Sequence, residues 1–534
     1  MTNYGSMNKQ NTILRLLLFL LITFGSFPTM GFASDLVWDP ITPGIDYQKF
    51  QLPDPNNVFV VRMDRSNTAL TLESSIAQGK LAQGAETVSE MYARYDQALN
   101  YWGGSSNPPT WGLRNQVVVA INGAYFGNDA IPQGGQVYSG WYAKRYDDWG
   151  GYTGFAWKLD RRAFIGGCVL HNPEDQLITY PSTGNTQQIT HVNTTRGSNE
   201  LVLYTTQYNT RTGTNSSGVE VVVEMSRPTL ILPTPAYASG FVQQIRQNGG
   251  DSLIPFNSIV LSASGTAAQT LLQNVQTGSE IRVSQEITDC PGNDPQSWTK
   301  TFAAIQGHYI FLADGQINEY EDDPGATWPD PRTAIAYNDQ YIFFIVVDGR
   351  ELYHSIGMTI GQLGEFSRDV LGATWGVAED GGGSSTMVIN GQVVNNTYCN
   401  IYSCLWKYAA YLPLVHHKSD RLHPARSANT EIFSSPAGIE RAVANGMLMV
   451  SVLPSEYSYT FTYGDAVVIN SATNMRLGPG TNYASFITIP AGAQGVIVDQ
   501  MNDLNGVLAK SVYWWYVNIN GTLGWMPESA LVNP

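Results

Sequence analysis

The sequence predicts an α+β fold, in which a large mixed domain of strands and a few helices precedes a small all-β module. Three observations predict it. The run Tyr341–Val347 is too apolar to be anything but a central strand. Apolar residues recur at helical spacing between Met358 and Leu371. Residues 460–534 contain short strands broken by turns and almost no helical pattern, and their number is typical of a small independent module.

Short strands separated by Gly, Asn and Asp turns dominate the chain before residue 341. We expect a helix at Glu86–Tyr95 and strands at Val58–Met63, Leu70–Glu73, Val117–Ile121 and Gly218–Glu224. The strand at Val117–Ile121 runs directly into Asn122-Gly123, a dipeptide that favours turns.

The stretch from residue 341 to residue 394 is the most regular part of the sequence. A helix should follow the Tyr341 strand, and a second buried strand is expected at Trp375–Glu379. The glycine loop Asp380–Ser385 comes next. Thr386–Ile389 and Gln392–Val394 then form a hairpin around an Asn-Gly turn. An unusual glycine loop therefore lies inside a predicted core rather than in a linker.

The last module resembles the bacterial SH3-like domain. Asn474-Met-Arg-Leu-Gly-Pro-Gly480 opens it, and Tyr513–Val517 with Gly521-Thr-Leu-Gly-Trp525 closes it, as in that family. The resemblance implies a cell-wall or ligand-targeting unit, with peptidoglycan as a partner. Alternatively, Trp514, Trp515 and Trp525 simply form the core of the module. The expected domains are a signal peptide at 1–33, a large domain at 35–452 and the SH3-like domain at 460–534.

The first residues indicate export. Lys9 and Arg15 precede an apolar run of roughly a dozen residues, Leu16–Phe27, and small residues occupy the cleavage positions at Gly31-Phe-Ala33. That run is shorter than the about 18 residues that span a bilayer, so a cleaved secretory signal is favoured over an uncleaved anchor. We expect a secreted or cell-envelope protein without a stable membrane span.

Charge and composition exclude one class of partner. Charged residues make up 14% of the chain and the formal net charge is −15, or −17 once Lys9 and Arg15 leave with the signal. A negative field repels nucleic acid, so nucleic acid is excluded as the main partner. A surface of neutral polar and aromatic groups suits a protein that handles glycans.

Four cysteines, at positions 168, 290, 399 and 404, are an even number and permit two disulfides with three connectivities in an exported protein. The sequence lacks Cys-x-x-Cys pairs and histidines at ligand spacing beside them, so we prefer disulfides, or free thiols, over zinc. We expect no metal, and no organic cofactor, because no nucleotide-binding glycine motif follows a strand in the required form.

The glycine loop is the first candidate for chemistry. Asp380 puts a carboxylate at the end of a buried strand. Gly381, Gly382 and Gly383 allow a ligand to approach the backbone, and successive N–H groups there would form an anion nest. Ser384 and Ser385 add hydroxyl donors. A flexible turn would have the same composition, but flexible linkers are rare inside a core.

Further candidates lie at other strand ends. Arg332, followed by Thr333, offers a planar guanidinium that grips phosphate or carboxylate through two bonds, although a surface salt bridge is the commoner role of an arginine. Asn122 is either a ligand contact or a turn residue. Asn193, Arg196 and Glu220 complete the set of polar candidates.

These segments occur together in a recognisable order. The chain resembles the phosphodiester glycosidase family over roughly residues 40 to 450, through the motifs Asn122-Gly-x-Tyr-Phe, Asn193 with Arg196, Gly218-Val-Glu220, Arg332-Thr-Ala-Ile, Val347-Asp-Gly-Arg350, Ser355-x-Gly-Met-Thr359, Asp380-Gly-Gly-Gly-Ser-Ser-Thr-Met387 and the closing segment Glu440-Arg-Ala-Val-Ala-Asn445. Glu379, where the family often has an apolar residue, and Ala336, where it commonly has Gly, depart from the pattern.

The resemblance implies cleavage of a sugar C1–O bond whose other side is a phosphate. Asp380 is the expected nucleophile or base, with Asp348 and Glu379 as candidates for a second carboxylate. Arg332 and the glycine loop would hold the leaving phosphate. Asn122, Asn193, Arg196 and Glu220 would bind sugar or phosphate oxygens. Asp348 is also explained as a turn former in Asp-Gly, and alternation along the strand would point Glu379 away from Asp380.

Two other functions fit the same residues. One is a glycosidase acting on an extracellular polysaccharide without phosphate. The other is a non-catalytic glycan or cell-wall binding protein, against which the presence of both Asp380 and Arg332 argues.

Overall fold

We describe a computed structural model of the chain. It describes residues 37–81, 84–95, 114–146, 153–226, 237–288, 298–351, 354–397, 439–453, 456–499 and 504–534. The predicted signal segment, the closely spaced cysteines 399 and 404, and Cys290 lie outside these residues. Cys168 is disulfide-bonded, so the prediction of disulfides holds at this position.

The protein is mostly β, and the predicted α+β class is wrong. Strands account for 47% of the structure and helices for 11%, and the strands form several sheets. The predicted helices exist, but α2 (Val88–Tyr95) and α5 (Ile360–Asp369) are only 8 and 10 residues long. Elements of that length cannot cover the faces of the sheets. Sheets therefore bury one another, and one apolar core contains Phe59, Trp157, Ile305, Phe344 and Met447 from different strands.

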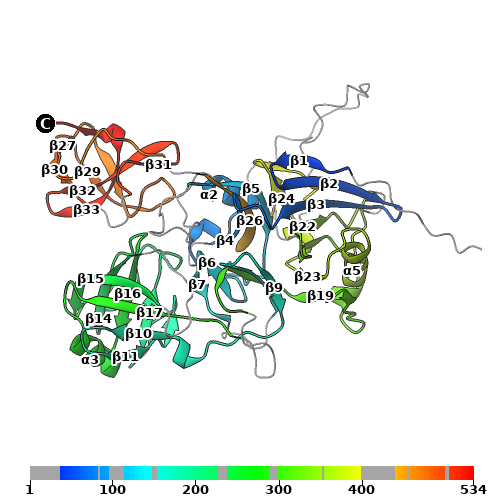
Figure 1. Cartoon of the computed structure of the whole chain (residues 1–534), viewed down its shortest axis with the longest axis horizontal. Helices are drawn as coiled ribbons and strands as arrows, with labels where there is room; N and C mark the ends of the chain where they lie inside the picture. Colours follow the sequence, from blue (N-terminus) through cyan, green and yellow to red (C-terminus); the bar gives the residue numbers. More distant parts are fainter. Residues whose placement is uncertain are drawn as a thin grey trace, which may run out of the picture. The chain divides into compact units, whose positions relative to one another are not determined.

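The sheet that carries the glycine loop has eight strands in the order β1-β2-β3-β22-β21-β23-β19-β20. Their bounds are β1 Asp39–Thr42, β2 Ile45–Leu52, β3 Asn56–Asp64, β22 Tyr341–Val347, β21 Arg332–Tyr337, β23 Trp375–Ala378, β19 Tyr309–Ala313 and β20 Gln316–Ile317. The strand predicted at Tyr341–Val347 is confirmed and central. Helix α5 packs against β19, β20 and β23 (Figure 1). A capping box between Thr359 and Gln362 starts this helix.

A second sheet has the order β25-β24-β5-β26-β4. It contains β24, the first strand after the loop in the sequence. It comprises β4 Leu70–Ile76, β5 Arg114–Asn122, β24 Met387–Ile389, β25 Gln392–Val393 and β26 Asn445–Leu453. The predicted hairpin is confirmed as β24 and β25. Asn390 and Gly391 join them with φ values of 48° and 79°, as a two-residue hairpin turn requires. Helix α2 packs on β5.

Two further sheets lie outside the loop region. The order β7-β6-β18-β8-β9 joins Trp141–Lys144, Gln136–Tyr138, Thr301–Gln306, Gly154–Lys158 and Ala163–Gly166. The order β11-β10-β17-β15-β14-β16-β13-β12 joins Asn185–Gln188, Leu177–Tyr180, Glu280–Ser284, Ala238–Gln247, Val219–Met225, Ser258–Ala263, Leu201–Tyr204 and His191–Val192. Helix α3 (Gly265–Asn274) packs on β16 and β11 of this sheet (Figure 1). The predicted strand at Gly218–Glu224 corresponds to β14.

The C-terminal strands form a sheet of their own, in the order β29-β28-β33-β32-β30-β27-β34, with β31 paired to β32. They span Ser485–Ile489, Thr473–Arg476, Thr522–Pro527, Val512–Ile519, Gln494–Ile497, Ala466–Ile469, Leu531–Val532 and, for β31, Val507–Ala509. Trp514, Trp515 and Trp525 are all buried. The aromatic motifs of this module therefore contribute to its core.

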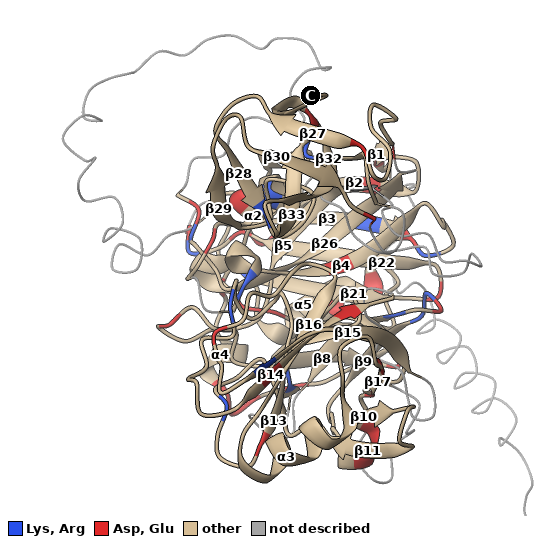
Figure 2. Cartoon of the chain, turned by 90° about the vertical axis from the view of Figure 1, so that its left-hand side faces the viewer, with Lys and Arg blue, Asp and Glu red and all other residues tan. Residues whose placement is uncertain are grey.

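Charged residues are few in the described part of the chain. Most of it is uncharged, with Lys, Arg, Asp and Glu at scattered positions (Figure 2). None of the helices in the described ranges has the length and apolar character needed to cross a membrane.

Candidate functional site

The glycine loop is fixed between the ends of strands from two sheets. The amide of Glu379 donates to the Thr333 carbonyl at the start of β21, and the amide of Asp380 donates to the Gly123 carbonyl just after β5. The Gly382 amide donates to the Pro331 carbonyl. The loop is therefore a part of the core with a defined conformation, as its position in the sequence predicted.

Asn122 and Thr333 hold this loop in place and do not line the cleft next to it. The Asn122 side chain is fully buried, and its Nδ2 donates to the Asp380 carbonyl at 2.7 Å. Its Oδ1 accepts from the Thr333 hydroxyl at 2.7 Å and from the Thr386 amide at 3.1 Å. Buried polar groups need such partners, so Asn122 connects the ends of β5, β21 and β23 into one unit.

Asp380 is a buried carboxylate with a raised pKa. Burial raises the pKa of Asp380 to about 6, while the Ser384 hydroxyl, the Arg441 charge and the Gly381 amide oppose that rise. The Ser384 hydroxyl donates to Asp380 Oδ2 at 2.6 Å. Arg441 Nη1 donates to the same hydroxyl oxygen at 3.0 Å and lies 3.8 Å from Asp380 Oδ2. At neutral pH this carboxylate is mostly ionised. Because its pKa lies only about one unit below neutral pH, it can also take up a proton.

Asp380 opens onto a cleft of about 300 Å³. The cleft is lined by three arginines, two aspartates, a tyrosine and four glycines, namely Arg332, Arg350, Arg441, Asp330, Asp380, Tyr125, Gly325, Gly381, Gly382 and Gly383. A Cβ atom at Gly381 would lie 2.6 Å from the Pro331 carbonyl oxygen, and Gly382 has a φ of +60°. These two positions therefore require glycine.

The three guanidinium groups are held in different ways. Arg332 is buried, and its Nε and Nη2 donate to the carbonyls of Met358 and Trp328 at 2.8 and 2.7 Å. Arg350 forms two hydrogen bonds to Asp330, of 2.8 and 3.2 Å. The Arg441 guanidinium lies 4.9 Å from the centroid of the Phe126 ring. The three cations outnumber the two carboxylates that line the cleft, so the cleft favours an anion.

The loop amides contribute less to this anion site than the glycine run predicted. The Gly381 amide interacts with the Asp380 carboxylate, and the Gly382 amide donates to Pro331. Among the three glycines, only the Gly383 amide has no hydrogen-bond acceptor within the described ranges. Ser384 is fully buried and its hydroxyl donates to Asp380, so this hydroxyl orients the carboxylate. The hydroxyl of Ser385 is buried without a partner in those ranges.

Neither candidate for the second carboxylate lines the cleft. Asp348 is buried and accepts from Asn395 Nδ2 at 3.2 Å and from the Asn396 amide at 3.0 Å. Burial raises the pKa of Asp348 to about 7. Glu379 is also buried, and within the described ranges neither of its carboxylate oxygens has a hydrogen-bond partner. Burial, and then the Asp380 charge, keep the pKa of Glu379 well above its ordinary value, which favours the protonated form of this side chain.

Three predicted contacts belong to a different region, the sheet that contains β14 and β16. Asn193 is buried and bonds to the carbonyls of Tyr142 and Ala143 and to Thr205. Arg196 donates to the Ser262 hydroxyl at 2.7 Å and to Asn215. Glu220 is fully buried and accepts four hydrogen bonds, from the hydroxyls of Thr212, Thr214 and Ser262 and from the Ser252 amide. None of the three lines the cleft.

Besides Gly325, four cleft residues had not been assigned a role from the sequence. Tyr125, Arg350 and Arg441 occur inside the quoted motifs, and Asp330 lies two residues before Arg332. Burial, and then the Asp380 charge, raise the pKa of Tyr125 to about 12, so it is a neutral phenol. The sequence could have indicated Arg350 by its place directly after Asp-Gly. It could have indicated Arg441 by its place in the closing segment.

Comparison with known proteins supports part of this picture. Residues 236–410 match the phosphodiester glycosidase family model. This segment is shorter than the resemblance suggested, and it contains Arg332, Arg350 and Asp380 but not Asn122 or Arg441. The match supports a hydrolase that acts on phosphodiester-linked sugars. No curated protein matches the chain by sequence.

Three solved structures are similar at low identity. A hypothetical protein from Synechocystis has 15% identity and a TM-score of 0.45, over 77% of this chain and 62% of that protein. A predicted exported protein from Burkholderia pseudomallei has 17% identity and a TM-score of 0.41, over 75% and 74%. The catalytic domain of zebrafish N-acetylglucosamine-1-phosphodiester alpha-N-acetylglucosaminidase, auto-inhibited by its pro-peptide, has 11% identity and a TM-score of 0.33, over 76% and 81%. The chain thus spans less than two thirds of the Synechocystis protein.

Proposed function

We propose that the chain is an exported glycosidase that hydrolyses a sugar-1-phosphodiester, with Asp380 as the nucleophile or base. The observation that carries the proposal is the composition of the cleft. Three guanidinium groups and two carboxylates line it; Asp330 is bonded to Arg350, and the other carboxylate, Asp380, has a pKa of about 6. A phosphodiester is a singly charged anion, which this excess of positive charge would bind.

The proposed reaction needs only one carboxylate. Ordinary glycosidases use a second one to protonate the leaving oxygen. A phosphate leaving group is a weak base and departs without that proton, provided that its developing charge is stabilised. In the proposed step the C1–O bond breaks, its electron pair leaves with the phosphate, and Arg332, Arg350 and Arg441 stabilise the new charge. Water supplies the oxygen at C1, and its proton passes to Asp380.

The cleft also favours this substrate over a polysaccharide without phosphate. Its second carboxylate, Asp330, is held by two hydrogen bonds to Arg350. Asp348 and Glu379 do not line the cleft, so the described residues offer no second carboxylic acid beside Asp380 and the Arg350-bound Asp330 to protonate an alkoxide leaving group. Tyr125 is the nearest alternative proton donor, but its pKa of about 12 makes it a weak acid.

The test is sugar release from N-acetylglucosamine linked through phosphate to a methyl mannoside. We expect Asp380→Asn to reduce the rate at least about a hundredfold, because the reacting carboxylate is lost. Asp348→Asn removes a buried carboxylate outside the cleft and is the matched control. A nitrophenyl glycoside without phosphate is assayed in parallel. Hydrolysis of that compound alone would support the polysaccharide reading, and binding without turnover would support a glycan-binding protein.

We further propose that residues 460–534 form an SH3-like module that directs the enzyme to the cell wall. The sequence motifs at Asn474–Gly480 and Gly521–Trp525 support this assignment. Tyr459 and Tyr463 are strongly exposed near the start of the module and are available for a ligand. Co-sedimentation of the full chain with purified peptidoglycan tests the proposal, with Tyr463→Ala as the variant. An absence of co-sedimentation by the wild type would contradict it.

A further inference from the structure

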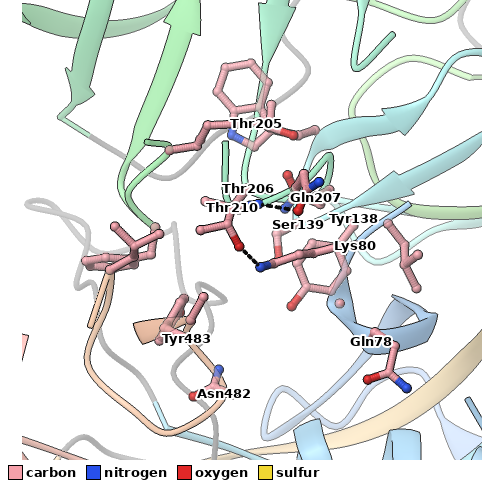
Figure 3. A pocket seen from close by; sticks show the side chains of 18 of the residues that line it. Gln78, Lys80, Tyr138, Ser139, Thr205, Thr206, Gln207, Thr210, Asn482 and Tyr483 are labelled. Atoms are coloured by element: carbon pink, nitrogen blue, oxygen red, sulfur yellow. Dashed lines mark hydrogen bonds between the residues drawn. The ribbon is translucent and has the colours of Figure 1, made fainter. Parts of the chain in front are cut away.

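A second cavity, of about 130 Å³, lies apart from the arginine cleft and shares no residue with it. Its wall includes the turn that follows β4, the segment 205–210 after β13, and Asn482 and Tyr483 from the loop between β28 and β29 (Figure 3). None of the residues assigned to the phosphodiester reaction lines it. Any ligand of this cavity is therefore bound independently of the proposed function.

The cavity contains a cation that has no acidic partner among the described residues. The Lys80 ammonium donates to the Thr210 hydroxyl, and Figure 3 shows the two side chains meeting at the cavity. The described residues that line the cavity include no Asp or Glu. Partial burial lowers the pKa of Lys80, and no carboxylate acts against that effect. The second cation in the wall, Arg94, is already engaged by Glu86 through its Nε and Nη2.

The cavity also contains an unsatisfied acceptor. Gln207 is 7% exposed, and its Oε1 is buried without a hydrogen-bond partner in the described part of the chain. A buried amide oxygen in this state is destabilising unless a donor reaches it. Hydroxyl groups of a ligand are donors of the required kind.

Aromatic rings complete the wall. Trp141, Tyr138, Phe256 and Tyr483 all line the cavity, and the rings of Phe256 and Tyr483 lie 5.4 Å apart. Aromatic walls with a few polar groups are typical of small-molecule sites. A cavity needs about 10–15 Å³ by this measure to admit one water molecule, so this one is large enough to admit several waters or a small polar ligand.

We infer that this cavity binds an acidic sugar unit, in which a carboxylate pairs with Lys80, hydroxyl groups donate to Gln207 and the ring packs on the aromatic wall. A neutral sugar would satisfy Gln207 but leave the ammonium unpaired. A simple anion would pair with Lys80 but leave the amide oxygen and the aromatic surface unused. The combination of the three features selects a sugar acid.

The experiment is a calorimetric titration of the full chain with methyl glucuronoside and methyl glucoside, which differ only in the carboxylate. We expect the glucuronoside to bind at least about tenfold more tightly, because hydrogen bonds to charged groups are the stronger ones. Lys80→Met should weaken glucuronoside binding about tenfold or more. Lys49→Met is the matched control, because Lys49 is exposed and does not line the cavity.

Two further variants keep the outcome decisive. Gln207→Glu preserves the shape of the side chain and adds a negative charge to the wall that Lys80 also lines, so it should also weaken glucuronoside binding if Lys80→Met does not fold. Asp380→Asn should leave this binding unchanged while it abolishes phosphodiester turnover, which separates the two sites. Absence of glucuronoside binding to the wild type, or equal binding by Lys80→Met and Lys49→Met, would overturn the inference.

Discussion

The hydrogen bond from Ser384 to Asp380 predicts a measurable change in the pH dependence of catalysis. In the proposed reaction Asp380 must be ionised to attack C1 or to accept a proton from water, so activity should fall as pH drops through its pKa of about 6. The Ser384 hydroxyl donates to the carboxylate at 2.6 Å and stabilises its charged form. In the variant Ser384→Ala this stabilisation is lost.

The size of the effect follows from the strength of such a bond. A hydrogen bond to a charged group contributes about 1.5–3 kcal/mol, and 1.36 kcal/mol corresponds to one pKa unit. The pKa of Asp380 should therefore rise from about 6 to about 7 or higher in Ser384→Ala. At pH 6 the ionised fraction would fall from about one half to about one tenth, a loss of about fivefold. Above about pH 9 the two enzymes should differ little through ionisation.

The assay is kcat/KM for release of sugar from the phosphodiester between pH 5 and pH 9. Ser385→Ala is the matched control, since its hydroxyl is buried next to Ser384 and has no hydrogen-bond partner in the described ranges. Its midpoint should stay near that of the wild type. An unchanged midpoint in Ser384→Ala, or the same displacement in both variants, would refute the reasoning, because the acid limb would then not report Asp380.

Three further predictions concern the structure around this carboxylate. Asn122→Ala should lower the free energy of unfolding by about 1–3 kcal/mol, measured with urea, because it leaves buried partners unsatisfied; a neutral effect would contradict the connecting role of this residue. Glu379→Gln should be increasingly more stable than the wild type as pH rises above 4.5, because a carboxyl with a raised folded-state pKa loses stability with rising pH; parallel stability curves would contradict a neutral Glu379. Gly381→Ala should abolish activity because its Cβ would lie 2.6 Å from the Pro331 oxygen, whereas Gly167→Ala, whose nearest atom is 3.9 Å away, should retain it; equal activities would contradict a rigid loop.

The sequence predicted the local elements around the site better than it predicted the fold class. The strand at Tyr341–Val347, the helix before residue 371 and the hairpin at Asn390-Gly391 follow from local periodicity and turn chemistry, and all three are present. The α+β class failed because it depends on what covers each sheet. That is decided by pairings between distant strands, such as β3 with β22, and periodicity along the chain does not encode them.

The same limit applies to the site. Asp380 and Arg332 were found because a carboxylate, a glycine run and an arginine stand at strand ends within about fifty residues of sequence. Arg441 contacts Ser384 across 57 residues, many of them outside the described ranges, so no local pattern associates the two. Asn122 was identified as a contact for the ligand, whereas the structure uses it to hold the loop from 258 residues away.

Hydrogen-bond satisfaction separates the carboxylates that a sequence pattern treats alike. Glu220 accepts four hydrogen bonds. Burial raises its pKa, but these hydrogen bonds outweigh burial and the net pKa is lowered. Glu220 is therefore a stable buried anion whose acceptor positions are already occupied. Asp380 has one side-chain donor, a pKa of about 6 and a cleft in front of it. Glu379 has no hydrogen-bond donor within the described ranges and does not line the cleft, and burial raises its pKa, which favours its protonated form. Among these three carboxylates, only Asp380 combines a pKa near neutral pH with a place in the cleft, and this combination supports the proposal that Asp380 is the reactive group.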